Sequence, residues 1–246
     1  MDKMLYISMS GLKQTLQAQA NNSHNLANVS TPGFRANLQA FTDAQVYGSG
    51  YNSRSYSQFS ANGVDHSAGS IIRTGNDLDI AIKGSGYIAV QGSAGQEGYT
   101  RAGNLKVSSN GLLTTSTGLP VIGNGGPIVI PPSSKIEIGK DGTISAIPLG
   151  QGATTVAILD RIKLVNPDKE KLTKGADGIL YLPDNGVADA DAKIGVEKGF
   201  IEGSNVNAID AMVNMIDLAR NFEMQSKMMK KSEEMDGAST RLLTMS

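Results

Sequence analysis

Apolar residues recur with helical spacing over the first part of the chain. The spacing of four, three and four residues predicts an α-helix over residues 3–27 with one apolar face. Asp2 is a candidate N-cap, and Ser30-Thr31-Pro32-Gly33 should end the helix because proline cannot continue it. The apolar face consists of Leu5, Met9, Leu12, Leu16 and Leu26.

A second helical pattern occupies the C-terminal part of the chain, from about residue 204 to residue 243. Asn207, followed by Asp210, resembles a capping box at its start. Such a helix is on the order of 55 Å long, more than a small domain usually covers. Its apolar residues form two rotated stripes, more than one partner helix could bury. The residues expected at its interface with other helices are Ile209, Met212, Ile216 and Phe222.

The middle of the chain has the opposite composition. All ten Met lie in residues 1–9 or 212–245, whereas all eight Pro lie between Pro32 and Pro183 and 27 of the 29 Gly between Gly33 and Gly203. Because Gly and Pro break helices, the middle is predicted to be a β-rich domain of short antiparallel strands. Asp141-Gly142 between two short apolar runs predicts a hairpin, and residues 156–165 a central strand or a strand pair.

These patterns divide the chain into four parts. Residues 1–34 form an N-terminal helix and turn, and residues 204–246 form a C-terminal helix. Residues 71–203 form the β-rich domain. Residues 35–70 are rich in Ser, Asn, Gly, Gln and Tyr without clear periodicity, so they are expected to be an extended arm or linker.

Composition excludes several classes of function. The formal net charge is −1, from 22 basic and 23 acidic residues, which leaves no electrostatic footprint for nucleic acid. There is no cysteine, and His24 and His66 have no partner spacing typical of a metal or catalytic site. No apolar run is long enough to span a bilayer, and the N-terminus does not read as a cleaved signal peptide. We therefore expect no enzyme, cofactor, metal site or membrane insertion.

Four segments resemble the flagellar basal-body rod and hook family. The first is Asn25-Leu26-Ala27-Asn28-Val29-Ser30-Thr31-Pro32-Gly33-Phe34-Arg35. Two central segments are residues 77–87, which begin Asp77-Leu78-Asp79, and residues 99–105, which begin Tyr99-Thr100-Arg101. The last is Gly203-Ser204-Asn205-Val206-Asn207. The resemblance covers nearly the whole chain in the expected order.

The resemblance implies a structural subunit of the rod rather than an enzyme. In that family, subunits leave the cytoplasm through the flagellar type III export apparatus without a cleaved signal peptide. They assemble in the basal body within the periplasmic space, with copies of themselves and other rod proteins as partners. Their terminal helices pair as a coiled coil on assembly, and the tube transmits torque from motor to hook. The residues expected at helix ends and turns are Asn25, Asn28, Pro32, Gly33, Asn205 and Asn207.

Two other functions remain open at this stage. The short length and the start of the chain favour a proximal rod subunit, with a distal rod or hook-type axial protein as the nearest alternative. In a different class, the β-rich domain could be a periplasmic ligand-binding module whose helices merely complete the fold. A rod subunit should have chain ends that need partners, whereas a binding module should be an ordered monomer throughout.

Overall fold

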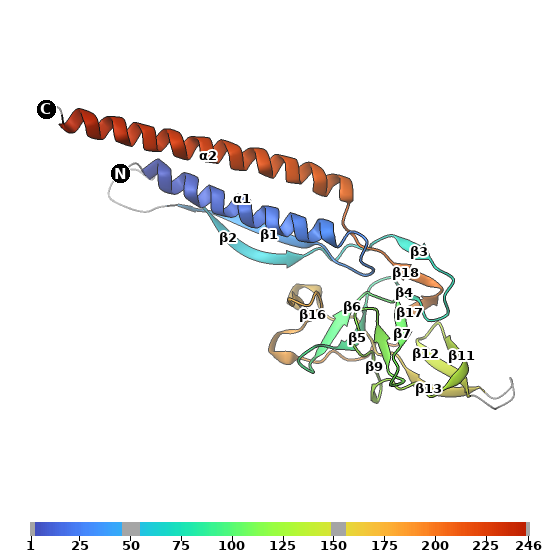
Figure 1. Cartoon of the computed structure of the whole chain (residues 1–246). Coiled ribbons are helices and arrows are strands. Elements are labelled where there is room, and N and C mark those ends of the chain that lie inside the picture. Colours follow the sequence, from blue (N-terminus) through green and yellow to red (C-terminus); the bar gives the residue numbers. More distant parts are fainter. Residues whose placement is uncertain (1–2, 46–54, 149–155, 245–246) are drawn as a thin grey trace. The chain divides into compact units, whose positions relative to one another are not determined.

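The computed structural model describes residues 3–45, 55–148 and 156–244 and consists of two compact units (Figure 1). The helical unit comprises Met1–Asn28, Asn37–Asp65 and Val206–Ser246. The β-rich unit comprises Val29–Ala36 and His66–Asn205. The central β-rich fold with a helix at each end of the chain is thereby confirmed.

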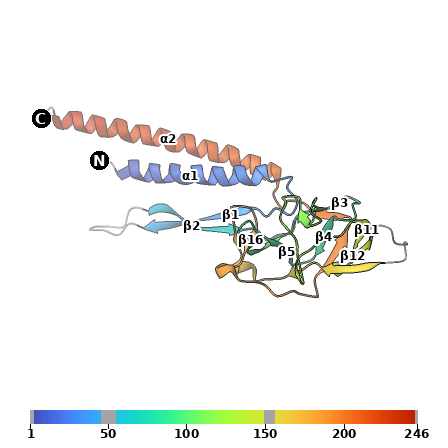
Figure 2. The same cartoon turned by 60° about the horizontal axis from the view of Figure 1, so that its bottom comes forward.

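The helical unit contains two helices and one hairpin. Helix α1 (Lys3–Ala27) and helix α2 (Ala208–Thr244) lie side by side in both views (Figures 1 and 2). The contacts of Asn22 with Ala211 and of Thr15 with Gln225 show that the helices run antiparallel. Strands β1 (Asn37–Gln45) and β2 (Ser55–Val64) form an antiparallel hairpin with a register shift between Ala40 and Phe41, and it packs against α1.

The observed helix boundaries agree closely with those expected. Helix α1 ends at Ala27, before the Ser30–Gly33 turn, as predicted. At the start of α2, Ile209 N–H donates to Asn207 Oδ1 at 3.0 Å, a contact that an N-cap residue makes. Asp210 accepts a hydrogen bond from the Asn207 side-chain amide at 2.7 Å rather than from its backbone, so the capping box is only partly formed. Asp2 lies outside the described residues.

The segment expected to be an extended arm or linker, residues 35–70, contains the paired strands β1 and β2. Its sequence hides this pairing because polar Ser, Gln and Asn residues are mixed with few apolar ones, so no period-2 alternation is visible. The strands are stabilised by their backbone pairing and by packing on α1, neither of which leaves a periodic signal in the sequence.

The β-rich unit is built from antiparallel strands throughout the part that the structure describes. A five-stranded sheet has the order β14-β5-β6-β16-β15 and a three-stranded sheet the order β11-β12-β13. The five-stranded sheet consists of β5 (Tyr87–Gln91), β6 (Glu97–Thr100), β14 (Leu164–Val165), β15 (Thr173–Lys174) and β16 (Leu180–Tyr181). The three-stranded sheet consists of β11 (Ser133–Ile138), β12 (Thr143–Pro148) and β13 (Ala157–Arg161).

Smaller pairs complete the unit. The paired strands are β3 (Ile71–Arg73) with β18 (Phe200–Glu202), β4 (Ile80–Lys83) with β17 (Gly195–Lys198), β7 (Leu105–Val107) with β8 (Leu113–Thr115), and β9 (Ile122–Gly123) with β10 (Gly126–Pro127). Two 3₁₀ turns are η1 (Lys169–Lys171) and η2 (Pro183–Asn185).

One continuous apolar core holds these sheets together. Among its fully enclosed side chains are Ile80, Ile88, Val90, Leu113 and Ile144. The expected hairpin at Asp141-Gly142 is confirmed between β11 and β12. Residues 156–165 contain two strands, β13 and β14, which do not pair with each other: each lies at the edge of a different sheet, so neither the central strand nor the strand pair is found.

Strand β4 lies in the interior of the β-rich unit. Ile80, Ala81 and Ile82 are all buried, so both faces of the strand are covered. Within the described residues, neither helix is apolar enough over sufficient length to cross a bilayer.

Candidate assembly interface

The two helices meet through small and polar side chains. In the described part of the helical unit, the buried residues are Ser8, Thr15, Ala211 and Ser232, and none of them is a large apolar residue. Thr15 Oγ1 donates to Gln225 Oε1 at 3.1 Å, and a Cβ on Gly11 would lie 3.0 Å from Gln225 Nε2. Small residues at such a seam let the helix backbones approach closely, while the large apolar residues on the same faces, among them Leu12, Leu218 and Phe222, are half-buried.

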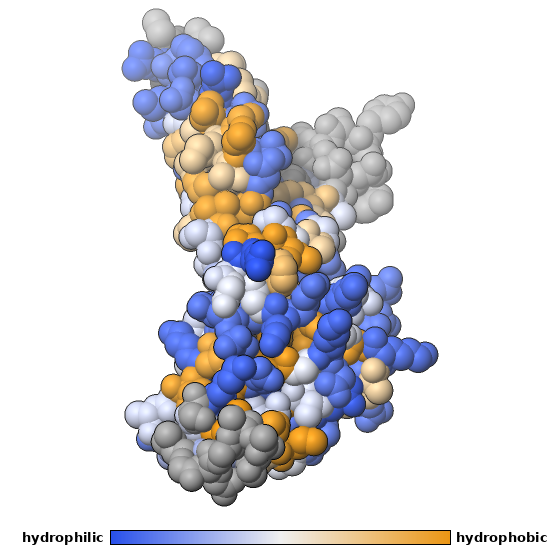
Figure 3. Space-filling view, turned by 90° about the vertical axis from the view of Figure 1, so that its right-hand side faces the viewer, coloured by the Kyte–Doolittle hydropathy of each residue, from blue (hydrophilic) through white to orange (hydrophobic). Residues whose placement is uncertain are grey.

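Large apolar side chains lie on the outer faces of the helices instead. Figure 3 shows hydrophobic residues at the surface along the helices. The exposed fraction reaches 72% for Ile209 and 54% for Ile216. The exposed apolar side chains on α2 are Ile209, Met212, Val213, Ile216, Met224, Met228 and Met235, and those on α1 are Tyr6, Met9 and Leu16.

The structure separates the residues that the sequence grouped as one interface set. Leu5, Leu12, Leu26 and Phe222 are half-buried within the helical unit. The other five residues of the set are exposed on the outer faces of the helices. They are Met9, Leu16, Ile209, Met212 and Ile216. The helical period identified the apolar positions, but it could not tell which of them the pairing of α1 with α2 would cover.

The asparagines at the end of α1 contact the backbone, as expected of residues at a helix end. Asn25 Oδ1 accepts from Asn37 N–H at 2.9 Å and Asn25 Nδ2 donates to Asn37 O at 3.0 Å, so one side chain binds both polar groups of a β1 residue. Asn28 Nδ2 donates to His24 O at 2.9 Å, which satisfies a carbonyl in the last turn of the helix.

The turn after α1 brings Gly33 into the β-rich unit. Gly33 is buried with a φ of 69°, a left-handed conformation that favours glycine. A Cβ here would overlap the backbone nitrogen of Ala102, while Pro32 beside it is half-buried. Gly33 N–H donates to Glu202 O at 2.7 Å, so the turn is fixed to strand β18.

Asn205 connects the last segment of the β-rich unit to the same region. Its Oδ1 accepts from Ala36 N–H at 2.7 Å, and its Nδ2 contacts both the carbonyl and the hydroxyl of Ser67 at 3.3 Å. Asn205 N–H also donates to Phe34 O at 3.3 Å. The entering segment, residues 33–36, and the leaving segment, residues 202–205, therefore lie together.

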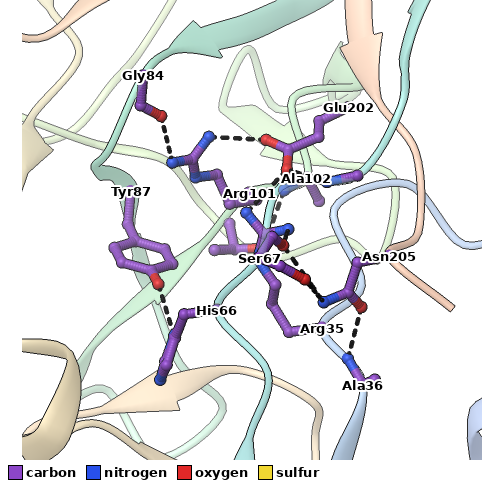
Figure 4. Close-up of polar contacts among 12 residues, drawn as sticks. Arg35, Ala36, His66, Ser67, Gly84, Tyr87, Arg101, Ala102, Glu202 and Asn205 are labelled. Carbon is purple, nitrogen blue, oxygen red and sulfur yellow. Dashed lines mark hydrogen bonds and ion pairs between the residues drawn. The ribbon is translucent and has the colours of Figure 1, made fainter.

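A buried Arg–Glu–Arg cluster joins these two segments (Figure 4). Arg35 Nη2 lies 2.8 Å from Glu202 Oε1, and Arg101 Nη1 lies 2.7 Å from Glu202 Oε2. Gly69 N–H donates to the same carboxylate at 2.9 Å, and Arg101 Nη2 donates to Gly84 O at 2.6 Å. All three charged side chains are almost fully buried.

Sequence reasoning missed this cluster. A single sequence does not indicate whether a charged residue is buried. The one signal that could have pointed to the cluster is that Arg35 and Arg101 lie inside the motifs that carry the family resemblance. In the structure, each of the four motif segments contributes a residue to this region, namely Arg35, Tyr87, Arg101 and Asn205. Arg101 lies over the Tyr87 ring at 5.5 Å, and burial raises the pKa of the Tyr87 hydroxyl.

Lys174 contacts the entering segment from another side. Its ammonium lies 3.7 Å from the centre of the Phe34 ring and donates to Arg35 O at 2.7 Å. Both contacts favour the charged form, but the loss of hydration on burial outweighs them and lowers the pKa of Lys174 to about 8.

The described residues hold no group of three or more side chains suited to a metal ion. His66 Nδ1 lies 2.8 Å from the Tyr87 hydroxyl, and the Nδ1 of His24 lies 3.3 Å from Asn37 Nδ2. The polar residues brought together here contact one another and the backbone, an arrangement typical of structural anchoring.

Family models match three stretches of the chain in order. The model described as "Flagella basal body rod protein" matches residues 5–35. "Flagellar hook protein FlgE/F/G D1 domain" matches residues 81–146, and "Flagellar basal body rod FlgEFG protein C-terminal" matches residues 197–242. The matches cover α1 with its turn, part of the β-rich unit, and the strand-to-helix segment before α2 with most of α2 itself.

Full-length relatives agree with these matches. The flagellar basal-body rod proteins FlgF of Salmonella typhimurium strain LT2 and of Escherichia coli strain K12 are each 42% identical over 252 residues, covering 100% of both chains. FlgG of Bacillus subtilis strain 168 is 32% identical over 258 residues, covering 94% of this chain and 96% of the relative.

The chain therefore belongs to the flagellar basal-body rod protein family. Within that family it is FlgF-like, and it is a structural subunit of the rod in the flagellar basal body.

Proposed function

We propose that the chain is a subunit of the proximal rod and that its terminal helices pair as a coiled coil with helices of neighbouring copies and other rod proteins. The assembled tube transmits torque from the motor to the hook. The chain has no catalytic role in this proposal and needs no cofactor.

The observation that carries the proposal is the inverted distribution of apolar residues in the helical unit. Small and polar side chains are buried between α1 and α2, whereas Ile209, Met212 and Ile216 are more than half exposed. Monomeric proteins rarely leave contiguous apolar strips in water, and such strips mark interaction sites. Further helices packing on these faces would bury the surface that the intramolecular seam leaves open.

The exposed set and the half-buried set then have different roles. Met9, Leu16, Ile209, Met212 and Ile216 form the contacts between subunits. The half-buried set packs within one subunit and extends to the edge of the contact with the next one. This set is Leu5, Leu12, Leu26 and Phe222. One surface docks on a different surface of the next subunit, so the array stays open and can grow along the rod.

The resemblance to FlgF proteins supports both the proximal position in the rod and the export pathway by which the subunit reaches it. We infer that the subunit leaves the cytoplasm through the flagellar type III export apparatus, without a cleaved signal peptide, and assembles in the periplasmic space. Its nearly balanced charge supports partners other than nucleic acid, and direct membrane insertion plays no part. The distal rod position is the alternative, and the full-length similarity to FlgF proteins does not favour it. Basal bodies purified from cells that lack this protein should be missing the proximal rod segment if the proximal position is correct. They should be missing the distal segment if the distal position is correct.

The substitution Ile216→Asp tests the interface. Ile216 is exposed in the subunit, so the folded chain should tolerate the change, but assembly would bury the new charge without a partner. We expect loss of swimming in soft agar and loss of the variant from purified basal bodies, with its circular dichroism unchanged.

The matched control is Asn214→Asp, which places the same charge on an exposed position of the same helix. Residues two apart on a helix do not share a face, so Asn214 lies off the Ile216 strip. This variant should swim like the wild type. If Ile216→Asp assembled into normal rods, the outer face of α2 would not be part of the interface between subunits.

A further inference from the structure

We propose that Met224, Met228 and Met235, on the outer surface of α2, are oxidation sites at which methionine sulfoxide blocks incorporation of the subunit into the rod. These three residues are called the Met strip. The reagent is a small neutral two-electron oxidant such as hypochlorous acid, and a thiol-dependent reductase is the class of enzyme that reverses the change. The inference rests on the proposed function in one respect, since it requires the outer surface of α2 to be buried on assembly.

The first step of the argument is the placement of the three thioethers. Spacings of four and seven residues bring Met224, Met228 and Met235 to one face of α2. At 1.5 Å per residue the strip is about 16 Å long. The exposed fractions of the three side chains are 55%, 45% and 55%, so no other part of the described chain encloses them.

The second step is that the Met strip is separate from the apolar positions nearer the start of α2. Asp217 lies seven residues before Met224, and its exposed carboxylate ends the strip on that face. Ile216 lies eight residues before Met224, a rotation of about 80° around the helix. Between Asp217 and Arg241 every exposed large apolar residue of α2 is a methionine. Oxidation can therefore change the character of this whole surface, whereas Ile and Val residues nearer the start of the helix are inert to it.

The chemical step is a two-electron oxidation at sulfur. Hypochlorous acid transfers its oxygen to Met Sδ, which supplies the electron pair of the new S–O bond, and the O–Cl bond breaks to release chloride and a proton. A thiol-dependent reductase returns that oxygen as water while two thiols become a disulfide. The chain has ten methionines and no cysteine, so thioethers are its only sulfur groups and no thiol of its own competes for the oxidant.

The oxidised side chain does not suit a packed helix interface. Methionine is flexible and apolar, whereas its sulfoxide is polar and disrupts Met-rich interfaces. Burying the sulfoxide oxygen without a hydrogen-bond donor is unfavourable, and the strip presents three such oxygens on one face. In the single subunit the same oxygens face water, so the modification acts on assembly rather than on the fold of the chain.

The exposure of the strip also determines when the modification occurs. The three side chains are accessible in the helix, and they would be accessible in an unfolded chain as well, so the inference needs no pairing of α1 with α2 before assembly. Neighbouring helices cover the strip once the rod is built. Oxidation therefore acts on subunits that await assembly and spares those already in the rod.

The ordinary alternative is that the three thioethers remain open to solvent in the rod and that their oxidation has no effect. Hypochlorous acid is added to the unassembled full-length chain and to purified basal bodies, and peptide mass spectrometry measures the sulfoxide at each Met. We expect the Met strip to be oxidised at least ~10-fold more slowly in basal bodies. Dissociation of the same basal bodies in guanidinium chloride should abolish this protection. Equal rates in the unassembled chain and in basal bodies would overturn the inference.

Glutamine substitution imitates the sulfoxide, because its side chain carries a polar oxygen at a similar distance from the backbone. The triple variant Met224→Gln, Met228→Gln and Met235→Gln should be at least ~10-fold rarer in purified basal bodies than the wild-type chain, with unchanged circular dichroism of the unassembled protein. Its matched control combines Glu223→Gln with Lys230→Gln, which places glutamine at exposed positions of α2 without changing the net charge.

The control positions do not share the face of the strip, because Glu223 is adjacent to Met224 and Lys230 lies two residues after Met228. The control should be incorporated like the wild type. Normal incorporation of the triple variant would contradict the inference, and so would an equal loss of the control.

A pulse experiment tests the modification itself on the wild-type chain. Cells that lack methionine sulfoxide reductases receive a sub-saturating pulse of hypochlorous acid, the oxidant is quenched, and rods are then allowed to grow. Sulfoxide at the Met strip should be at least ~10-fold rarer in subunits from the new basal bodies than in unassembled subunits of the same cells. The same sulfoxide content in both pools would mean that oxidised subunits assemble, and the inference would be wrong.

These outcomes are distinguishable from a failure of the proposed interface. Protection and exclusion at the Met strip, together with normal rods from Ile216→Asp, would keep the inference and place the subunit contact on the second half of α2. Loss of rods in Ile216→Asp with normal incorporation of the triple glutamine variant would keep the proposed interface and remove the inference.

Discussion

At the scale of single residues, Gly33 shows how strongly one position in the turn after α1 is constrained. Its left-handed backbone disfavours any other residue, and the backbone of Ala102 fills the place of a Cβ. We predict that Gly33→Ala lowers the free energy of unfolding of the β-rich unit by about 3 kcal/mol, from the sum of left-handed strain and overpacking. Urea unfolding with unchanged m-value would measure this loss.

Gly75 provides the comparison for this prediction. It has a similar φ of 78°, but nothing lies within 4 Å of its hypothetical Cβ. Gly75→Ala should therefore cost only the strain of the left-handed conformation, about 1 kcal/mol. Equal costs at the two positions would show that the contact with Ala102 can relax.

Lys174 gives a residue-scale prediction about pH. Burial lowers its pKa to about 8, so the folded state releases this proton earlier than the unfolded chain, where lysine titrates near 10.5. Between about pH 8 and 10.5 the unfolded chain binds more protons at this position, so stability rises with pH across that window. We expect the stability of the wild type to increase relative to Lys174→Met between these two pH values.

Amine labelling provides an independent check on Lys174. At pH 8 a large share of its amine is neutral, whereas the hydrogen bond with Glu234 raises the pKa of the exposed Lys231. Acetic anhydride should therefore modify Lys174 early despite its partial burial. Labelling of Lys174 well after Lys231 would contradict the lowered pKa.

At the scale of elements, what a sequence can predict depends on how local the signal is. Both helices were predicted because their period is local, and Asn207 was recognised as a cap because capping involves residues two or three apart. The β1–β2 hairpin was missed because its polar strands carry no period and pair across a wide separation. The order of the strands likewise depends on non-local pairing.

The candidate site likewise has residues that the sequence could predict and residues that it could not. Sequence motifs pointed to Gly33 and Asn205 as turn residues, and the structure places both at the junction of the chain ends. Glu202 was missed because a lone Glu in a strand usually faces water, and only the fold brings Arg35 and Arg101 to it. The division of apolar residues between the inner seam and the outer face of α2 was equally inaccessible, since it depends on where α1 lies.

At the scale of the whole molecule, the two units differ in what holds them together. The β-rich unit encloses large side chains such as Tyr87, Tyr99 and Ile144, each at most 1% exposed. In the described part of the helical unit the fully buried residues are small or polar, and large apolar residues such as Leu12 and Phe222 are only half-buried. Since burial of apolar surface is the main stabilising contribution to folding, the free energy of unfolding must be unevenly distributed along this chain.

This difference predicts unfolding in two steps rather than one. On heating the unassembled subunit, helical circular dichroism at 222 nm should fall first, and the near-ultraviolet signal of the buried tyrosines should fall at a higher temperature. Ile144→Ala, in the β-rich core, should cost about 2–5 kcal/mol and lower only the second transition. Ile216→Ala, on the exposed face of α2, should leave the second transition in place. Coincident transitions at both wavelengths would mean that the helices are stabilised as strongly as the β-rich core, and a subunit of that kind would gain little from neighbours on its outer faces.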